Sequence, residues 1–258
     1  MKVKIIFNSF FYLLLFIITT AIHGQINTEK FRQDADTIGF TGNADIDATA
    51  ITGNTDFQLL SIGGKVNYNW GNDYTFLVLD AGFGWKDGES FSDNSLFHLR
   101  HVLSLSELMQ LEFFTQYDFN KDRLLLDREL AGAGVRFKVF TNDYLKFRYG
   151  LACMFEHEVY DLPANSVHDH KTSISRMSSY VTFELKLQEN LSFGSVTYYQ
   201  PNVIALNDYR LISENSLTVI LGSLVDLNIK FNMRFDSHPP DLVKRFDTVS
   251  KFGLLFKF

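Results

Sequence analysis

Charged side chains recur at every second position in several stretches of this sequence, as in Arg136-Phe137-Lys138 and Lys146-Phe147-Arg148. Alternate residues of an extended strand share a face, so these charges are expected to line one surface. Fixed charges along a narrow path attract counter-ions and guide small solutes. Such charges would guide the passage of solutes, a process in which no bond is made or broken. The lumen-lining candidates are Asp80, Arg100, Glu112, Arg136, Lys138, Lys146, Arg148, Lys230, Arg234 and Lys251.

Two arrangements of these charges stay open. In the first, they pair with one another as a hydrated ion-pair network that fills the interior. In the second, they line a narrow channel, and the excess of basic residues on four neighbouring stretches favours anions. The expected number of strands does not decide between these two arrangements, because a barrel of about twelve strands lies between filled barrels of eight strands and open porins of sixteen or more.

Four residues near the longest polar loop have the side chains of a zinc site, namely His157, His168, Asp169 and His170. Two histidines and a carboxylate can hold zinc. Polar loops often match this pattern by chance, however, so the sequence predicts no metal and no cofactor.

A lipid-facing hydrolase is the other chemistry to consider, because it needs a histidine beside a serine nucleophile. His101 falls on an apolar strand face, but the sequence contains no His-x-Ser motif. An interfacial aromatic role explains His101 equally well. The chain is therefore predicted not to be an enzyme.

The last stretch, Phe246 to Phe258, shows which elements hold these charges. Phe252, Leu254, Phe256 and Phe258 share one strand face, opposite Lys251 and Lys257. Such a strand fits the closing strand of a transmembrane β-barrel, with one face toward lipid and one toward the lumen. Its terminal aromatic also resembles the signal read by the outer-membrane assembly machinery. The alternative is an edge strand of a soluble sheet.

Similar alternation recurs along the chain and predicts about twelve antiparallel strands in an up-and-down barrel. The stretch at 191–200 is the weakest of these predictions, since both of its faces mix apolar and polar residues. A longer polar loop is expected at 86–94. Backbone groups in hydrocarbon must be paired within the protein, so the sheet is expected to close on itself. A soluble sandwich would have strands of about five or six residues. The expected strands are 39–51, 57–70, 74–86, 95–105, 109–120, 127–140, 144–157, 172–187, 191–200, 209–221, 225–236 and 246–258.

The N-terminal residues read as a secretory signal. Lys2 and Lys4 precede an apolar run, and small residues lead to a predicted cleavage site after Gly24. The predicted division is a signal peptide at 1–24, a periplasmic lead-in at 25–38 and the barrel at 39–258.

Composition agrees with this class. The 258 residues include 26 Phe and 11 Tyr but 4 Pro, which suits long uninterrupted strands. A formal charge of −6 argues against a nucleic-acid partner. The single cysteine, Cys153, excludes an internal disulfide and is predicted to be a small packed hydrophobe.

Two motifs resemble a known family. Gly53-Asn54-Thr55-Asp56 follows the first strand, and Asp118 and Arg128 flank a loop that leads to Gly132-Ala133-Gly134. This pattern is similar to the family called domain of unknown function 481, which includes proteins described as salt-induced outer-membrane proteins. The resemblance implies an outer-membrane barrel and no catalytic residues. From the residues themselves, the glycines are expected to make room inside the barrel, and the Asp118–Arg128 pair to steady a loop.

The sequence thus predicts an outer-membrane barrel that acts as a narrow passive channel for small solutes, with a preference for anions. A sealed structural or stress-related barrel with partner-binding outer loops is the alternative, and a lipid hydrolase is a remote one. The expected partners are membrane lipid and, during insertion, the assembly machinery.

Overall fold

The computed structural model describes residues 38–53, 56–222 and 225–256, and within these it leaves out the side chains at 43, 45, 47, 251 and 253–256. The predicted signal peptide, the lead-in up to residue 37, Asn54, Thr55 and Phe258 lie outside the described residues, as do the side chains of Lys251, Leu254 and Phe256. No helix in the described parts is long and apolar enough to cross a membrane.

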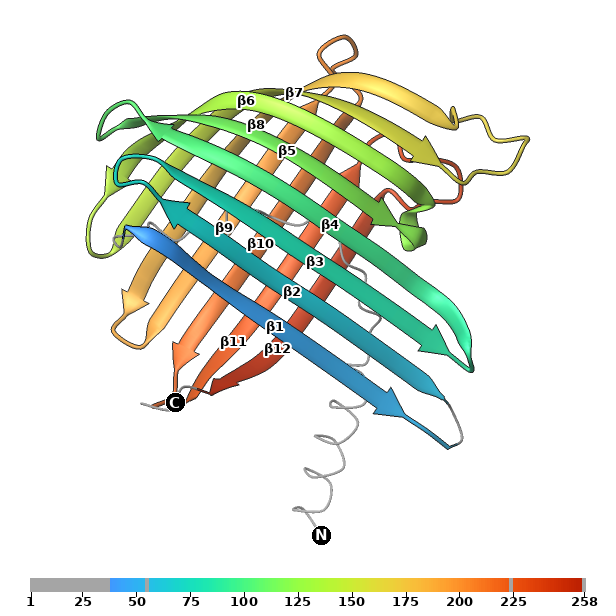
Figure 1. Cartoon of the computed structure of the whole chain (residues 1–258), viewed down its shortest axis with the longest axis horizontal. Coiled ribbons are helices and arrows are strands. Elements are labelled where there is room, and N and C mark those ends of the chain that lie inside the picture. The colour runs from blue at the N-terminus through green and yellow to red at the C-terminus, as the bar shows by residue number, and fades with distance from the viewer. Residues whose placement is uncertain (1–37, 54–55, 223–224, 257–258) are drawn as a thin grey trace, which may run out of the picture.

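In the described residues, twelve antiparallel strands form one sheet in which each strand pairs with its neighbours in sequence (Figure 1). The predicted fold class is confirmed. Figure 1 shows the sheet curled into a barrel, with β1 to β4 in front and β9 to β12 behind. The strands are β1 Gly39–Ile51, β2 Phe57–Asn69, β3 Tyr74–Lys86, β4 Glu89–Ser104, β5 Met109–Asn120, β6 Leu125–Thr141, β7 Leu145–Tyr160, β8 Lys171–Gln188, β9 Leu191–Pro201, β10 Tyr209–Ile220, β11 Val225–Asp236 and β12 Phe246–Phe256, and a short 3₁₀ helix, η2, spans Lys121–Arg123.

The expected ladder between the first and last strands is not among the described pairings. In those parts of the chain, β1 pairs with β2 and β12 pairs with β11. The described sheet therefore has two edge strands, β1 and β12.

One end of the barrel carries the three longest connections, at 161–170, 202–208 and 237–245, and is called here the long-loop end; the opposite end is the short-turn end. The prediction of a longer loop at 86–94 is wrong. Asp87 and Gly88 instead form a two-residue hairpin with φ of 52° and 82°, and β4 begins at Glu89. Asp-Gly favours this turn because both of its central residues need positive φ.

The two faces of the sheet are opposite in character to those of a soluble barrel. Charged side chains such as Arg128 (1% exposed) and Glu156 (0% exposed) are buried inside, whereas Phe97 and Phe155 on the outer face are 39% and 55% exposed. Cys153 is exposed as well, which corrects its predicted role as a packed hydrophobe, because its strand position points outward, opposite Ala133 and Met177.

Glycines on the inner face make room for aromatic rings. Gly150 lies opposite Tyr180, and Gly132 lies opposite Phe114. A Cβ at either glycine would overlap the facing ring. With no side chain at Gly150, Tyr180 lies over β7, and its hydroxyl donates to Glu112 Oε2 of β5 at 2.9 Å. The glycines therefore let one tyrosine connect strands three places apart in the sheet.

Candidate functional site: the charged interior

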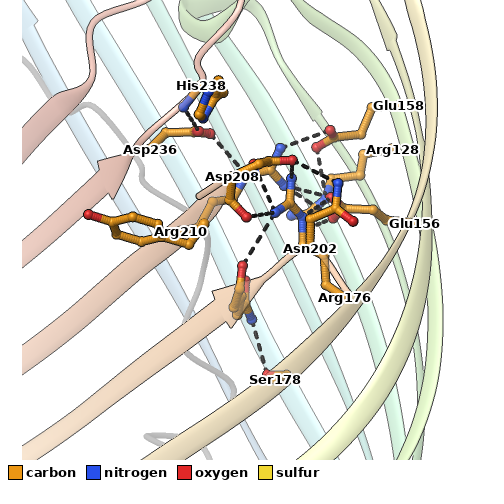
Figure 2. A network of polar contacts seen from close by, with 12 residues as sticks. Arg128, Glu156, Glu158, Arg176, Ser178, Asn202, Asp208, Arg210, Asp236 and His238 are labelled. Carbon is orange, nitrogen blue, oxygen red and sulfur yellow. Dashed lines mark hydrogen bonds and ion pairs between the residues drawn. The ribbon is translucent and has the colours of Figure 1, made fainter. Parts of the chain in front are cut away.

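Glu156 lies at the centre of an ion-pair network near the long-loop end (Figure 2). Its Oε2 accepts from Arg128 Nη2 at 2.8 Å, its Oε1 accepts from Arg176 Nε at 2.6 Å, and Arg210 Nη1 donates to both oxygens at 3.1 Å. The three arginines come from β6, β8 and β10, whereas Glu156 comes from β7.

A second carboxylate, Glu158, binds two of these arginines, Arg128 and Arg210. Arg210 Nη2 donates to Glu158 Oε2 at 2.9 Å, and Arg128 Nε lies 3.2 Å from Glu158 Oε1. Tyr160 also donates to Glu158 Oε2, at 2.8 Å. Glu156, Glu158 and Tyr160 follow one another on the inner face of β7, as period two requires.

The network continues to both sides of this centre. Arg210 Nε donates to Asp236 Oδ2 at 2.9 Å, and the guanidinium of Arg176 binds both oxygens of Asp208, at 3.1 and 3.2 Å. Asp208 belongs to the β9–β10 connection, so Arg176 ties that loop to the barrel wall. We call the full set the long-loop network; it comprises Asp118, Arg128, Glu156, Glu158, Arg176, Asp208, Arg210, Arg234 and Asp236.

The predicted contact between Asp118 and Arg128 is present, with Arg128 Nη1 and Asp118 Oδ2 3.4 Å apart. Both residues are almost fully buried. The pair therefore belongs to the interior of the barrel as well as to the base of the β5–β6 connection.

Two of the loops above this network are joined to each other. The Asp241 carboxylate accepts from the backbone N–H groups of Val167 and His168, at 2.7 and 2.8 Å. The His168 ring packs edge-on against Tyr160, with 5.3 Å between the ring centres. The connections at 161–170 and 237–245 therefore cover part of the long-loop end together.

Apolar and aromatic side chains lie between the network and the short-turn end. Leu130, Met154, Tyr180, Tyr198 and Ile212 line a cavity of about 40 Å³. This size leaves room for a few water molecules and no larger solute. The β4 to β9 side of the lumen is therefore filled at this level.

The short-turn half of the lumen is rich in basic residues. Arg100 pairs with Glu112 at 3.2 Å, Arg136 donates to Gln110 at 3.2 Å, and Arg148 donates to Glu184 at 2.5 Å. Lys146 lies 3.7 Å from Glu184. On the described strands β4 to β8, inward positions in this half hold six basic residues (Arg100, Arg136, Lys138, Lys146, Arg148, Lys186) and two acidic ones (Glu112, Glu184), a formal excess of four positive charges.

The wall on β10 and β11 is polar and more exposed. Lys230 is exposed although its position faces inward, and Glu214, Ser216 and Asn232 are half-buried. This contrasts with Arg136 and Arg148, which are 2% and 3% exposed. The wall on β10 and β11 is therefore more accessible to solvent than the wall on β6 and β7.

The remaining lumen candidates occupy different environments. Asp80 is half-buried on β3, and Arg234 pairs with Asp236 at 3.3 Å in the long-loop network. The backbone places Lys251 opposite Lys230. Lys138 is half-buried on β6. The candidates thus divide between the two halves of the barrel.

The possible zinc ligands are not gathered together. His157 Nδ1 lies 2.8 Å from Ser173 Oγ, and His168 Nδ1 lies 2.8 Å from the backbone oxygen of Asp169. Across the described residues, no three His, Cys, Asp or Glu side chains form a group that could hold a metal.

Sequence reasoning placed Glu158 and Asp208 in loops and did not single out Arg210. A usable signal was present, because Glu156-x-Glu158-x-Tyr160 and Asp208-x-Arg210-x-Ile212 continue the alternation at the strand ends. It also overlooked the inward apolar residues, such as Phe76 (1% exposed) and Val78 (0% exposed).

The fold and interior define an antiparallel β-barrel with buried charges inside and apolar side chains outside. The chain belongs to the family described as "Protein of unknown function, DUF481", whose model matches residues 44–258.

Three solved structures are similar to this chain. The NanC porin is 9% identical, with a TM-score of 0.46 and coverage of 85% of this chain and 99% of the porin. The KdgM porin is 10% identical, with a TM-score of 0.41 and coverage of 85% and 98%. The translocator domain of the autotransporter NalP from Neisseria meningitidis is 11% identical, with a TM-score of 0.44 and coverage of 87% and 90%. No curated protein matches the sequence.

Proposed function

We propose that this protein is an outer-membrane barrel that provides a narrow passive path for small solutes, with a preference for anions. The observation that carries the membrane location is the reversal of the two faces. Phe97, Phe155 and Phe231 are 39%, 55% and 44% exposed on the outside, whereas Arg128 and Glu156 are almost fully buried within. Lipid is the solvent that favours this arrangement.

A labelling experiment on Cys153 tests the membrane location. In the proposed location, the outward-facing thiol in the middle of β7 would contact hydrocarbon, so a charged maleimide is expected to react slowly with the barrel in lipid nanodiscs and rapidly after denaturation. A Lys244→Cys change in a Cys153→Ser background, on an exposed loop, is the control and should label rapidly when folded. Equal rates for the two folded proteins would contradict a lipid-facing β7.

The water-accessible wall of β10 and β11 supports passage, and the basic short-turn half supports anion preference. A charge focused by low-dielectric walls raises the local concentration of its counter-ion. Because the long-loop network is nearly balanced in charge, with four arginines and five carboxylates, the excess of positive charge lies at the short-turn end.

Planar-bilayer recording tests both parts of the proposal. The wild-type barrel is expected to conduct and, in a salt gradient, to show a reversal potential on the anion side. A Lys138→Gln, Lys146→Gln, Lys186→Gln variant should lower the anion-to-cation permeability ratio severalfold, because one charge 4 Å away is worth about 1 kcal/mol even in water. A matched Lys86→Gln, Lys121→Gln, Lys171→Gln variant removes three lysines at the other end. A preference for cations in the wild type would overturn the anion assignment.

A sealed barrel is the second candidate, and the buried long-loop network favours it. In that case, the bilayer would show no channel events from correctly folded protein. The partner in that role would bind the joined loops at 161–170 and 237–245.

We also propose that the protein does not hydrolyse lipid. His101 Nδ1 lies 2.8 Å from Thr75 Oγ1, a contact that supports an interfacial role for both side chains. Release of fatty acid from phospholipid by the purified barrel, abolished by His101→Ala, would contradict this proposal.

A further inference from the structure

A small pocket of about 20 Å³ lies at the long-loop end, beside the connection at 237–245. Leu125 and Tyr160 form an apolar wall, and both are buried. Pro240 and Val243 of the loop complete another side. The pocket is thus shaped by barrel strands and by a loop that they hold in place.

Arg123 projects from η2 into the lining of this pocket. Its backbone N–H donates to Asn120 Oδ1 at 3.0 Å, which caps η2 and fixes the point where the side chain leaves the backbone. Leu124 then ends the turn in the left-handed conformation, with φ of 54°, and its N–H donates to Lys121 O at 3.0 Å. The position of the Arg123 side chain is therefore set by local backbone structure.

The Arg123 side chain forms no ion pair within the described parts of the chain. The residue is 7% exposed, and its Nε is buried without a hydrogen bond. A buried cation without a counter-charge is costly, and the cost falls when an anion binds it. This contrasts with Arg128, which binds three carboxylates a few residues away.

Three further basic residues border the pocket, namely Arg234, Lys244 and Arg245. Lys244 and Arg245 are exposed and form no ion pair within the described parts of the chain. The bordering carboxylates Glu158 and Asp236 already bind Arg210, at 2.9 Å each. Asp247 is the third acidic residue of the lining. The pocket therefore has more positive charge available than its own carboxylates neutralise.

We propose that this pocket binds an oxyanion, a carboxylate or phosphate group, with Arg123 as its principal ligand. The planar guanidinium matches both groups through paired N–H donors. Lys244 and Arg245 add charge at the opening of the pocket. The site does not depend on conduction, because a sealed barrel would present the same pocket at its surface.

Calorimetric titration of the folded full-length barrel in uncharged detergent tests the proposal, with sodium phosphate and sodium acetate as probes at constant ionic strength. Saturable binding of at least one probe is expected. Arg123→Gln should weaken it about ten- to a hundredfold, as expected for a lost charge-assisted hydrogen-bond pair. Lys121→Gln, an exposed neighbour in η2, should leave it unchanged. If Arg123→Gln does not fold, a Lys244→Gln, Arg245→Gln variant on the exposed loop should still weaken binding severalfold.

A second arm separates the two sources of such a group. Mixed micelles that contain phosphatidylglycerol should compete with free phosphate if a lipid headgroup reaches the pocket, and should not compete if the pocket takes soluble anions. Both results support an oxyanion site and assign its ligand. Absence of saturable heat with either probe, or equal affinity in the wild type and Arg123→Gln, would overturn the proposal even if the barrel conducts anions.

Discussion

Replacing Glu156 by glutamine is expected to lower the free energy of unfolding by about 3–5 kcal/mol, the range seen when one partner of a buried ion pair is removed. Glu156 accepts hydrogen bonds from Arg128, Arg176 and Arg210, and it is fully buried. A neutral amide has one acceptor oxygen in place of two charged ones. Three guanidinium groups would then share Glu158 and the outer carboxylates.

Urea unfolding of the barrel in lipid vesicles, followed by tryptophan fluorescence, measures this effect. Glu129→Gln is the matched control, because Glu129 is exposed on the outer face of β6, next to Arg128 in sequence. The expected change in the free energy of unfolding of the Glu129→Gln variant is within about 0.5 kcal/mol. Equal stability of the two variants would mean that the arginines do not depend on Glu156.

Replacing Gly150 by valine is expected to destabilise the barrel by a similar amount through a different cause. A Cβ at position 150 overlaps the ring of Tyr180, so the ring must move away from β7. Overpacking of this kind costs about 1–3 kcal/mol. Displacement of Tyr180 also breaks its 2.9 Å hydrogen bond to Glu112, and a bond to a charged group contributes about 1.5–3 kcal/mol.

Gly222→Ala is the control for this change, since a Cβ there meets no atom within 4 Å. The same urea titration applies. A Gly150→Val, Tyr180→Ala double variant should recover part of the loss, because removing the ring relieves the overlap. A double variant with the full sum of the two single losses would show that Gly150 and Tyr180 do not interact.

The sheet was predictable because its signal is local. Alternation along Met109–Asn120 and Val225–Asp236 gives the strand, its inward face and its length from neighbouring residues alone. Even the weakest prediction, at 191–200, corresponds to β9. The loop predicted at 86–94 is wrong because polar residues at Ser92 and Asn94 read as loop, whereas they occupy buried inward positions of β4.

The interior was less predictable because it depends on contacts between strands that are distant in sequence. The positions of Arg100, Glu112, Arg136 and Arg148 on the inner face follow from period two. The convergence of three arginines on Glu156 does not, since it depends on the curvature of the sheet and on where each strand ends. The same period also puts Phe76 and Met154 on the inner face, but their apolar type suggests the lipid face, whereas a barrel interior accepts both kinds of side chain.

The strictly sequential strand order has a consequence for how the chain assembles. Each ladder joins consecutive strands, so every hairpin can form from a short segment with little loss of loop entropy. The contact between Arg210 and Glu156 joins residues 54 positions apart and needs four strands in place first. Hairpins should therefore form early, whereas the salt bridges between Arg210 and Glu156 should form only after β10 has joined the sheet. A nascent chain truncated before β10 would retain its sequential hairpins but lack the salt bridges between Arg210 and Glu156.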